Sequence, residues 1–469
     1  MSKTKPASSS ELRPDLCYCS SVDYRFGRLI LTVVPSISVA ATTPLGTIAV
    51  LLQRAKRHFT YHDTKMTKPL HVGILTSGAH PVQTIYLPAL NALPDLYTID
   101  AIYSSEPESS SSFPSPCLNE ILTSPTINLI LNFMPNEYHE LYTIAALQAG
   151  KHVMVETPVS LSIPSARRIL DAEREAPNGA RIFVASARRY APCFENVFKE
   201  EISGLERIHY ARLRMIAGPH VAHTATNNTT PTGDNNNSSL KVPVSGRGTN
   251  GYNHYNEYTT TRDQNHQKLA ASSEDRNARL RGLMDEVFGE DEQPNQERVA
   301  LSRFLASLGC HDLGLMRDTL GYPDAVSNIS VNEPFYSALF HYNGGESELH
   351  PFTLMYETGT DGVPRCDGQL AVYGQNKTVT IHYDLPYARG QPVRVVVEKA
   401  DERGGLMQTE TVSTWEEAYE QELKALYAHL VEGKEAKTTA KDSLQDIRLF
   451  QTIFEQYNRQ CGTIRTPLG

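Results

Sequence analysis

The fold is decided by residues 127–173, which have the sequence INLILNFMPNEYHELYTIAALQAGKHVMVETPVSLSIPSARRILDAE. The apolar run at 126–134 predicts a buried strand, and residues 137–150 predict a helix that ends at a glycine. Residues 151–156, KHVMVE, predict the next strand, and residues 162–175 predict another helix. Strands that alternate with helices in this way are typical of βαβ units with a parallel sheet.

The same alternation extends towards both ends of this stretch. HVGIL at 71–75 predicts the first strand, residues 84–93 a helix and YTIDAIY at 97–103 a second strand. This unit has the length of a mononucleotide-binding fold. RIFVAS at 181–186 continues the pattern. We therefore predict an α/β Rossmann dinucleotide-binding domain over residues 66–190.

The later part of the chain has a different pattern. A helix is predicted through residues 311–320, followed by strand-like runs with the sequences ALFHY, FTLMYE, QLAVYG, TVTIHY and VRVVVE. These runs indicate a largely antiparallel open sheet. Amphipathic segments at 415–432 and 441–457 predict helices that pack back on the core. Residues 191–469 are therefore expected to form an α/β domain for substrate binding and oligomerisation.

Two segments are expected to lie outside this fold. Residues 220–293 contain the low-complexity run NNTTPTGDNNNSS and predict a solvated insertion with a short helix around 274–288. Residues 1–65 are Ser-rich at their start and predict a disordered extension. The apolar run at 29–52 contains two prolines, which argues against a membrane span. We expect a cytoplasmic protein, with a mitochondrial targeting segment as the alternative.

Composition restricts the partners of the protein. The 469 residues carry a formal net charge of −9, which provides no basic field for nucleic acid. The seven cysteines are scattered, and the pair Cys17 and Cys19 has no second pair to complete a zinc site. We therefore expect a small-molecule ligand, no nucleic acid, no membrane and no metal.

The turn after the first strand is the expected dinucleotide site. Its sequence is GILTSGAHP at 73–81, so Gly78 fits the middle glycine of the fingerprint, while Thr76 and Pro81 occupy the outer glycine positions. In the structural alternative, Gly73 and Gly78 only shape the turn from the strand to the helix and do not bind a dinucleotide.

The end of the second strand bears on the choice of dinucleotide. Ser104 and Ser105 follow this strand and can donate hydrogen bonds to a phosphate. No carboxylate stands at the position that usually binds the adenosine ribose, which favours NADP over NAD. Glu106 binding the ribose of NAD remains the alternative.

Several motifs resemble the Gfo/Idh/MocA oxidoreductase family. They are MPN at 134–136, the later His139, AGKHV at 149–153 and ETP at 156–158. The resemblance implies a Rossmann domain, an α/β domain with an open sheet, and NAD(P)-dependent chemistry on sugars, inositols or related polyols. The segments RRYAP, SEDRNAR, GCHDLGLMRDTLG and PFYSALF further resemble a fungal subgroup of uncharacterised oxidoreductase-like proteins.

The resemblance also implies residue roles in cofactor binding. Gly78 and Ala79 would lie at the pyrophosphate, and Glu156 at the nicotinamide ribose or in a position that orders the site. Pro135, Asn136 and His139 would flank the nicotinamide half of the dinucleotide. With those from the turn and the second strand, the expected cofactor-binding residues are Gly73, Thr76, Gly78, Ala79, Ser104, Ser105, Pro135, Asn136, His139 and Glu156.

The family's catalytic set is incomplete in this chain. Thr157 occupies the place of the family's lysine, and Ser307 that of an aspartate four residues before a histidine. His311 keeps the histidine, and its unperturbed pKa near 6.5 suits proton transfer. The expected catalytic residues are His311 and Thr157, while a purely structural role is the alternative for His311. Two further residues, Arg189 and Asp312, are expected at the substrate, and structural pairing is the alternative for Arg189.

Three functions follow from these observations. The first is an NAD(P)-dependent oxidoreductase that acts on a hydroxyl or carbonyl of a small sugar- or polyol-like substrate. The second, motivated by the missing Lys and Asp, is a catalytically silent dinucleotide-binding sensor or regulator. The third is a non-redox isomerase or lyase. The resemblance also implies a homodimer or homotetramer that pairs through the C-terminal sheet.

Overall fold

The structure, a computed structural model, describes the chain in seven stretches. They are residues 68–77, 82–104, 117–218, 266–289, 296–344, 351–388 and 391–461. All of them belong to one contact unit, Met66–Gly469. The predicted extension at 1–65 lies outside the described residues, as do Gly78, Ala79, Ser105 and most of the predicted insertion.

The first sheet contains five parallel strands. They are β1 (Leu70–Thr76), β2 (Tyr97–Ser104), β3 (Leu129–Phe133), β4 (His152–Glu156) and β5 (Ile182–Ala185). Their order is β2-β1-β3-β4-β5, so β1 pairs with β2 on one side and with β3 on the other. In open parallel sheets, ligands bind beyond the carboxyl ends of the strands, where the strand order reverses.

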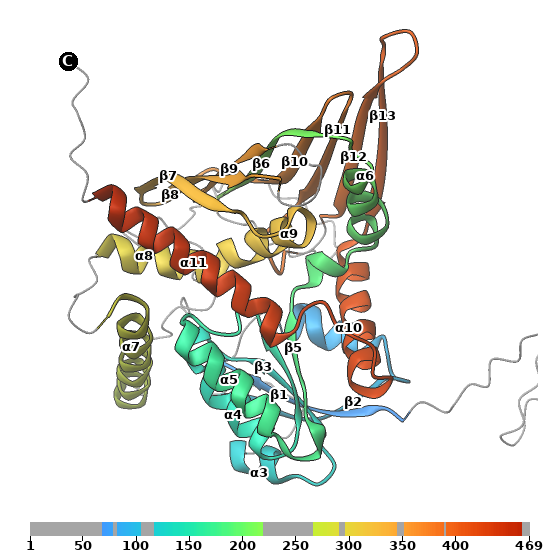
Figure 1. Ribbon diagram of the computed structural model, residues 1–469. Helices are drawn as coiled ribbons and strands as arrows, with labels where there is room; N and C mark the ends of the chain where they lie inside the picture. Colours follow the sequence, from blue (N-terminus) through green and yellow to red (C-terminus); the bar gives the residue numbers. More distant parts are fainter. Residues whose placement is uncertain are drawn as a thin grey trace, which may run out of the picture. The chain divides into compact units, whose positions relative to one another are not determined.

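Both faces of this sheet are buried, which explains its near-continuous apolar strands. Successive side chains point to opposite faces, so Ile74 and Leu75 belong to different core clusters. One face packs against η1 (Val82–Tyr86), α2 (Leu87–Asn91) and α10 (Trp415–Val431). The other packs against α3 (Leu118–Thr123), α4 (His139–Gln148), α5 (Ile163–Glu175) and the start of α11 (Ala440–Cys461) (Figure 1).

The second sheet contains eight strands. They are β6 (Ile208–Ala217), β7 (Ala325–Asn332), β8 (Phe335–Tyr342), β9 (Phe352–Thr360), β10 (Cys366–Gly374), β11 (Lys377–Tyr383), β12 (Val393–Ala400) and β13 (Leu406–Ser413). Their order is β13-β12-β11-β10-β6-β9-β8-β7. Neighbours are antiparallel except for the parallel pair β6 and β9. The predicted combination of a Rossmann sheet with a largely antiparallel open sheet is confirmed.

Helices lie between the two sheets (Figure 1). α8 (Gln296–Phe304), η6 (Leu305–Gly309), α9 (Cys310–Leu320) and the second half of α11 pack against the apolar face of the eight-stranded sheet. Because the start of α11 packs on the parallel sheet, this helix contacts both cores. Short segments η3 (Pro177–Gly179), η4 (Ala187–Tyr190), η5 (Phe194–Phe198) and α6 (Lys199–Ser203) complete the connections.

Helix α10 packs on the parallel sheet although it follows the second sheet in the chain. Leu423 and Leu426 belong to the core cluster that contains Val72 and Leu131. The helix begins at a capping box in which the Thr414 hydroxyl accepts a hydrogen bond from the backbone N–H of Glu417. The parallel sheet is thus covered by residues from both ends of the described chain.

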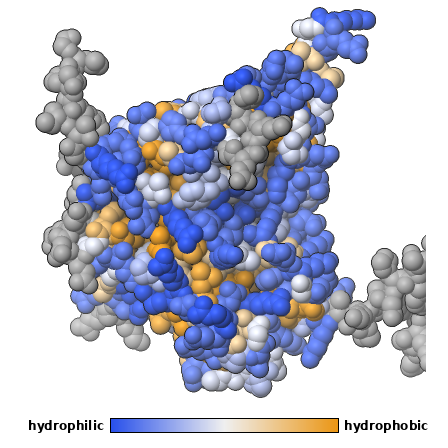
Figure 2. All heavy atoms as spheres, viewed as in Figure 1, coloured by the Kyte–Doolittle hydropathy of each residue, from blue (hydrophilic) through white to orange (hydrophobic). Residues whose placement is uncertain are grey.

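The end of the predicted insertion forms a helix, as expected. α7 (His266–Phe288) begins earlier than the predicted residue 274. It contacts the parallel-sheet layer through polar groups, including the ion pair of Glu286 with Arg168 and the hydrogen bond of Tyr138 to Asp275. None of the helices in the described stretches is long and apolar enough to cross a bilayer. Figure 2 shows polar residues over most of this face, with apolar residues gathered mainly between the two sheets.

Candidate active site

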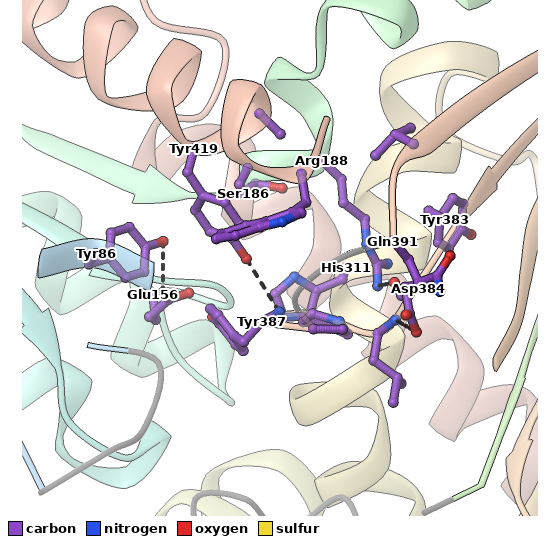
Figure 3. A pocket seen from close by; sticks show the side chains of 17 residues that line it. Tyr86, Glu156, Ser186, Arg188, His311, Tyr383, Asp384, Tyr387, Gln391 and Tyr419 are labelled. Atoms are coloured by element: carbon purple, nitrogen blue, oxygen red, sulfur yellow. Dashed lines mark hydrogen bonds between the residues drawn. The ribbon is translucent and has the colours of Figure 1, made fainter. Parts of the chain in front are cut away.

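A pocket lies where the ends of β4 and β5 meet α9, α10 and the segment after β11 (Figure 3). Its lining includes Tyr86, Glu156, His311, residues 186–188 and residues 383–388. The cavity has a volume of about 40 Å³, which is space for roughly three water molecules. Side chains from both sheet layers therefore converge on one small pocket that is lined by polar and apolar groups.

His311 lies in this pocket, on the first turn of α9. Its side chain is largely buried, and its ring lies edge-on to Tyr387 at a centroid distance of 6.0 Å. Burial, followed by the positive charge of Arg188, lowers the pKa of His311 to about 3. This pKa is lower than the unperturbed pKa near 6.5 that was expected from the sequence. The imidazole is therefore neutral at pH 7. In this state it can orient a hydroxyl by a hydrogen bond.

Arg188 also lines the pocket, and Asp312 holds it in place. Arg188 Nη1 donates to Asp312 Oδ1 at 2.9 Å, and the guanidinium lies 4.4 Å from the centre of the Tyr383 ring. Burial raises the pKa of Asp312 to about 6, although Arg188 opposes this effect. Asp312 is fully buried and is not part of the pocket lining. It therefore contacts Arg188 from behind rather than facing the pocket.

Arg189 lies away from the pocket lining. Its Nε is 2.9 Å from Asp318 Oδ2, and its Nη1 is 2.5 Å from Asp442 Oδ2. Asp442 also pairs with Arg317, so the contacts join η4, α9 and α11. This geometry corresponds to the structural-pairing alternative for Arg189. Of the two adjacent arginines, Arg188 is the one that faces the pocket.

Thr157 directly follows β4 but is not among the residues that line the pocket. It is mostly buried, and its carbonyl oxygen lies 3.9 Å from the Sγ of Cys310. Ser307, in the place of the family's aspartate, donates its hydroxyl proton to the carbonyl of Phe304 within its own helical segment. Neither residue thus contributes a titratable group to the pocket.

The turn after β3 carries Pro135, Asn136 and His139, as the motif predicted. The ring nitrogens of His139 lie 2.9 Å from the carbonyl oxygens of Met134 and Pro158, so the histidine links the turns after β3 and β4. Asn136, in η2 (Asn136–Tyr138), donates to the carbonyl of Ala306 at 3.2 Å. Pro135 immediately precedes η2. These residues are gathered at the carboxyl edge of the parallel sheet.

Hydroxyl groups stand at the carboxyl ends of β1 and β2. Thr76 and Ser104 are paired in register. The adjacent Ser77 has a buried hydroxyl with no hydrogen-bond partner among the described residues. An unpaired buried hydroxyl beside a strand-order reversal fits the phosphate and ribose oxygens of a dinucleotide. Gly73 lies earlier in β1, where an added Cβ would be 2.8 Å from the Cγ2 of Ile121, so its small size allows α3 to pack closely.

Two buried carboxyl groups meet beside the pocket. The Tyr86 hydroxyl lies 3.1 Å from Glu156 Oε1 and 3.3 Å from Glu422 Oε2. The backbone N–H of Ser186 donates to the other oxygen of Glu422 at 2.5 Å. Burial raises the pKa of Glu156 to about 7, despite hydrogen bonds from Tyr387 and Tyr86. Burial and the nearby Glu156 raise the pKa of Glu422 well above its usual range.

Several residues in or beside the pocket were not found from the sequence. Tyr86 and Tyr387, which line it, and Glu422, which contacts Tyr86, lie in segments far apart in the chain, and no motif marks them. Ser77 is different because it stands inside the predicted dinucleotide turn and could have been named there. Gly78, Ala79 and Ser105 lie outside the described residues, so their predicted contacts stay predictions.

Comparison with known proteins supports this arrangement. Residues 70–185 match the family described as an oxidoreductase family with an NAD-binding Rossmann fold, Gfo/Idh/MocA. Over 76 residues, the chain is 34% identical to 1,5-anhydro-D-fructose reductase of Ensifer adhaerens, covering 16% of this chain and 22% of that protein. Over 135 residues it is 31% identical to scyllo-inositol 2-dehydrogenase (NADP(+)) of Bacillus subtilis, covering 28% of this chain and 37% of that protein. The chain thus spans well under half the length of these curated relatives.

Solved structures match over a larger part of the chain. The aldose-aldose oxidoreductase of Caulobacter crescentus is 17% identical, with a TM-score of 0.54, and the match covers 85% of this chain and 100% of that one. At this identity the likeness concerns the fold alone. Residues 70–185 thus match the Gfo/Idh/MocA family model, and most of the chain shares its fold with this solved structure.

Proposed function

We propose that the protein is an NAD(P)-dependent oxidoreductase that acts on a hydroxyl or carbonyl carbon of a small sugar- or polyol-like molecule. The observation that carries this proposal is the pocket at the carboxyl ends of β4 and β5, in the same parallel sheet whose β1 and β2 end in hydroxyl side chains. Thr76 and Ser104 stand at the ends of β1 and β2, and Glu156 and His311 line the pocket. The names of the two curated relatives, a sugar reductase and an inositol dehydrogenase, support the substrate class.

The residues at the edge of the sheet suit a dinucleotide. When bound, the nicotinamide would accept or return the hydride. Thr76 and Ser77 would hydrogen-bond its phosphates, and Ser104 would bind at the adenosine ribose. Because Ser104 offers a hydroxyl rather than a carboxylate at the end of β2, we expect NADP to bind more tightly than NAD.

The residues of the pocket suit a neutral substrate. The charge of Arg188 is balanced by Asp312, so an anionic group has less to gain there than at an unpaired arginine. Neutral His311 would hydrogen-bond the reacting oxygen.

A silent regulatory protein is the second candidate. It is favoured by Thr157 and Ser307 in the places of the family's lysine and aspartate, and by the low pKa of His311, which makes it a weak base. Under this hypothesis, the protein binds the dinucleotide and a small molecule without turnover.

A substrate screen distinguishes the candidates. The purified full chain is incubated with NAD⁺ or NADP⁺ and a panel of inositols, sugars and sugar alcohols, and the absorbance of the reduced nicotinamide is followed. We expect turnover with at least one polyol, and faster turnover with NADP⁺. Binding of dinucleotide without turnover across the panel would favour the regulator. Conversion of a substrate without net reduction of the dinucleotide would favour an isomerase or lyase.

A further inference from the structure

We propose that Glu156 and Glu422, joined through the Tyr86 hydroxyl, form a proton-sharing carboxyl pair that takes up the proton of the reacting hydroxyl. This inference rests on the proposed function, because it assigns a proton acceptor to that reaction. In the family that the sequence resembles, a lysine at the position of Thr157 transfers this proton. Here we assign proton transfer to the pair of carboxyl groups.

The geometry of the pair favours a shared proton. A phenol carries a single proton to donate. The Tyr86 hydroxyl lies within hydrogen-bond distance of both Glu156 Oε1 and Glu422 Oε2. Two ionised carboxylates would have to share that single proton and would repel each other, so protonation of one carboxyl, which then donates to the phenol oxygen, is the favoured arrangement.

The second oxygen of Glu422 indicates which carboxyl holds the proton. Glu422 Oε1 accepts from the Ser186 backbone N–H, which leaves Oε2 as the atom that faces Tyr86. Protonation at Oε2 gives a continuous order of donors, in which Glu422 donates to Tyr86 and Tyr86 donates to Glu156. Glu156 is then the ionised member, and it is the one of the two carboxyls that lines the pocket.

The surroundings keep the pair at one negative charge. Glu156 is 3% exposed and Glu422 0%, and neither forms an ion pair within the described residues. The titratable groups around them are Tyr86 on η1, Tyr97 on β2, Tyr190 and Arg188 on η4, Tyr419 on α10, Tyr387 after β11, and His311 and Cys310 on α9. Arg188 is already paired with Asp312. Two adjacent carboxyl groups in such a site do not both ionise near neutral pH.

Glu156 is also placed to reach a substrate. In Figure 3, Glu156 and His311 lie on either side of Tyr387 within the same pocket. In the oxidation, the substrate C–H bond breaks and its electron pair leaves as hydride to the nicotinamide. The O–H bond breaks, its proton passes to the Glu156 carboxylate, and a C=O bond forms. Reduction follows the reverse order, so no further reactant is needed. Glu422 and Tyr86 act as positioning residues.

Infrared spectroscopy tests the shared proton without relying on activity. The carbonyl stretch of a protonated buried carboxyl group is recorded while the pH is raised from about 5 to about 9, a range in which exposed carboxyls are ionised. We expect the wild-type band to persist above pH 7 and to be lost in Glu422→Gln. Glu420→Gln, on the exposed side of the same helix and paired with Lys424, should keep it. A wild type with no such band, or a band unchanged in Glu422→Gln, would overturn the pair.

The pH dependence of turnover tests the role of Glu156. Wild-type oxidation should rise as the pH increases through about 7, because Glu156 must be ionised. Glu156→Gln should lower turnover roughly 10²-fold and remove this rise, with dinucleotide affinity unchanged. Tyr86→Phe should move the rise to higher pH, because Glu156 loses a hydrogen bond that stabilises its charge. A Glu156→Gln enzyme that keeps the wild-type pH profile would overturn the role.

The two proposals fail in different ways. A wild type that binds dinucleotide and shows the infrared band, but never turns over, overturns the proposed function and with it the catalytic role of Glu156, while the shared proton stands. Turnover without the band overturns the pair alone. Thermal melting of each variant identifies those that do not fold, and the Tyr86→Phe variant keeps the test decisive if Glu156→Gln is among them.

Discussion

Replacing Arg189 with methionine should lower the free energy of unfolding by about 3 kcal/mol, the lower end of the range for breaking a buried ion pair. The guanidinium is almost completely buried and contacts the carboxylates of Asp318 and Asp442. Its loss leaves two poorly solvated negative charges. Lys199 and Arg317 still reach these carboxylates, which limits the effect.

The pKa of Asp318 gives this prediction a pH dependence. Burial alone would raise it, but the charges of Arg189 and Lys437 outweigh burial and lower it to about 2. A carboxyl whose pKa is lower in the folded protein stabilises the fold above its usual pKa, and this contribution is lost as the pH falls towards the folded value. The difference between wild type and Arg189→Met should therefore be largest near neutral pH and shrink in acid.

Urea unfolding at pH 7 measures the effect, and Arg174→Met is the matched control. Arg174 pairs with Asp171 at an exposed site, where such pairs contribute less than about 1 kcal/mol. If Arg189 instead binds substrate, Arg189→Met would unfold like the control and raise the KM. That result would refute the structural assignment.

Replacing His311 with alanine should lower turnover by roughly 10²-fold or more and leave dinucleotide affinity almost unchanged. Because the pKa of His311 is about 3, the imidazole acts as a neutral hydrogen-bonding group. The ratio of wild-type to variant turnover should then stay constant between pH 6 and pH 9, a range that begins about three units above that pKa.

Steady-state kinetics across this pH range provide the measurement. His311→Gln keeps a hydrogen-bond donor and should retain part of the activity, while His209→Ala changes an exposed histidine on β6 and should behave as wild type. An equal loss of dinucleotide affinity in His311→Ala would show that the residue supports the cofactor site rather than the reacting oxygen.

The parallel sheet could be predicted because its strands are buried on both faces. Runs such as residues 129–133 and 152–156 are almost entirely apolar, and helical patterns separate them. β13 carries no such signal. Its residues LMQTETVS are nearly all exposed at the edge of the second sheet, so no alternation distinguishes the strand from a loop. β7, the other edge strand, contains Asn328 with a positive φ of 49° and a register shift.

The site could be predicted only in part. Motif spacing identified Glu156 and His311, and both line the pocket. It could not choose between Arg188 and Arg189, because adjacent residues in a tight helical turn point in different directions. Glu422 is 336 residues from Tyr86, and only the packing of α10 on the parallel sheet brings them together. The pKa of His311 likewise depends on burial, which the sequence did not reveal.

The most direct test of the account is calorimetric titration of the full chain with NADP⁺, NADPH, NAD⁺ and NADH. The account predicts saturable binding of a dinucleotide at one site per chain, tighter for NADP(H) than for NAD(H). Absence of binding for all four would contradict it, because the hydroxyls beyond β1 and β2 would then not form a dinucleotide site despite the Rossmann fold.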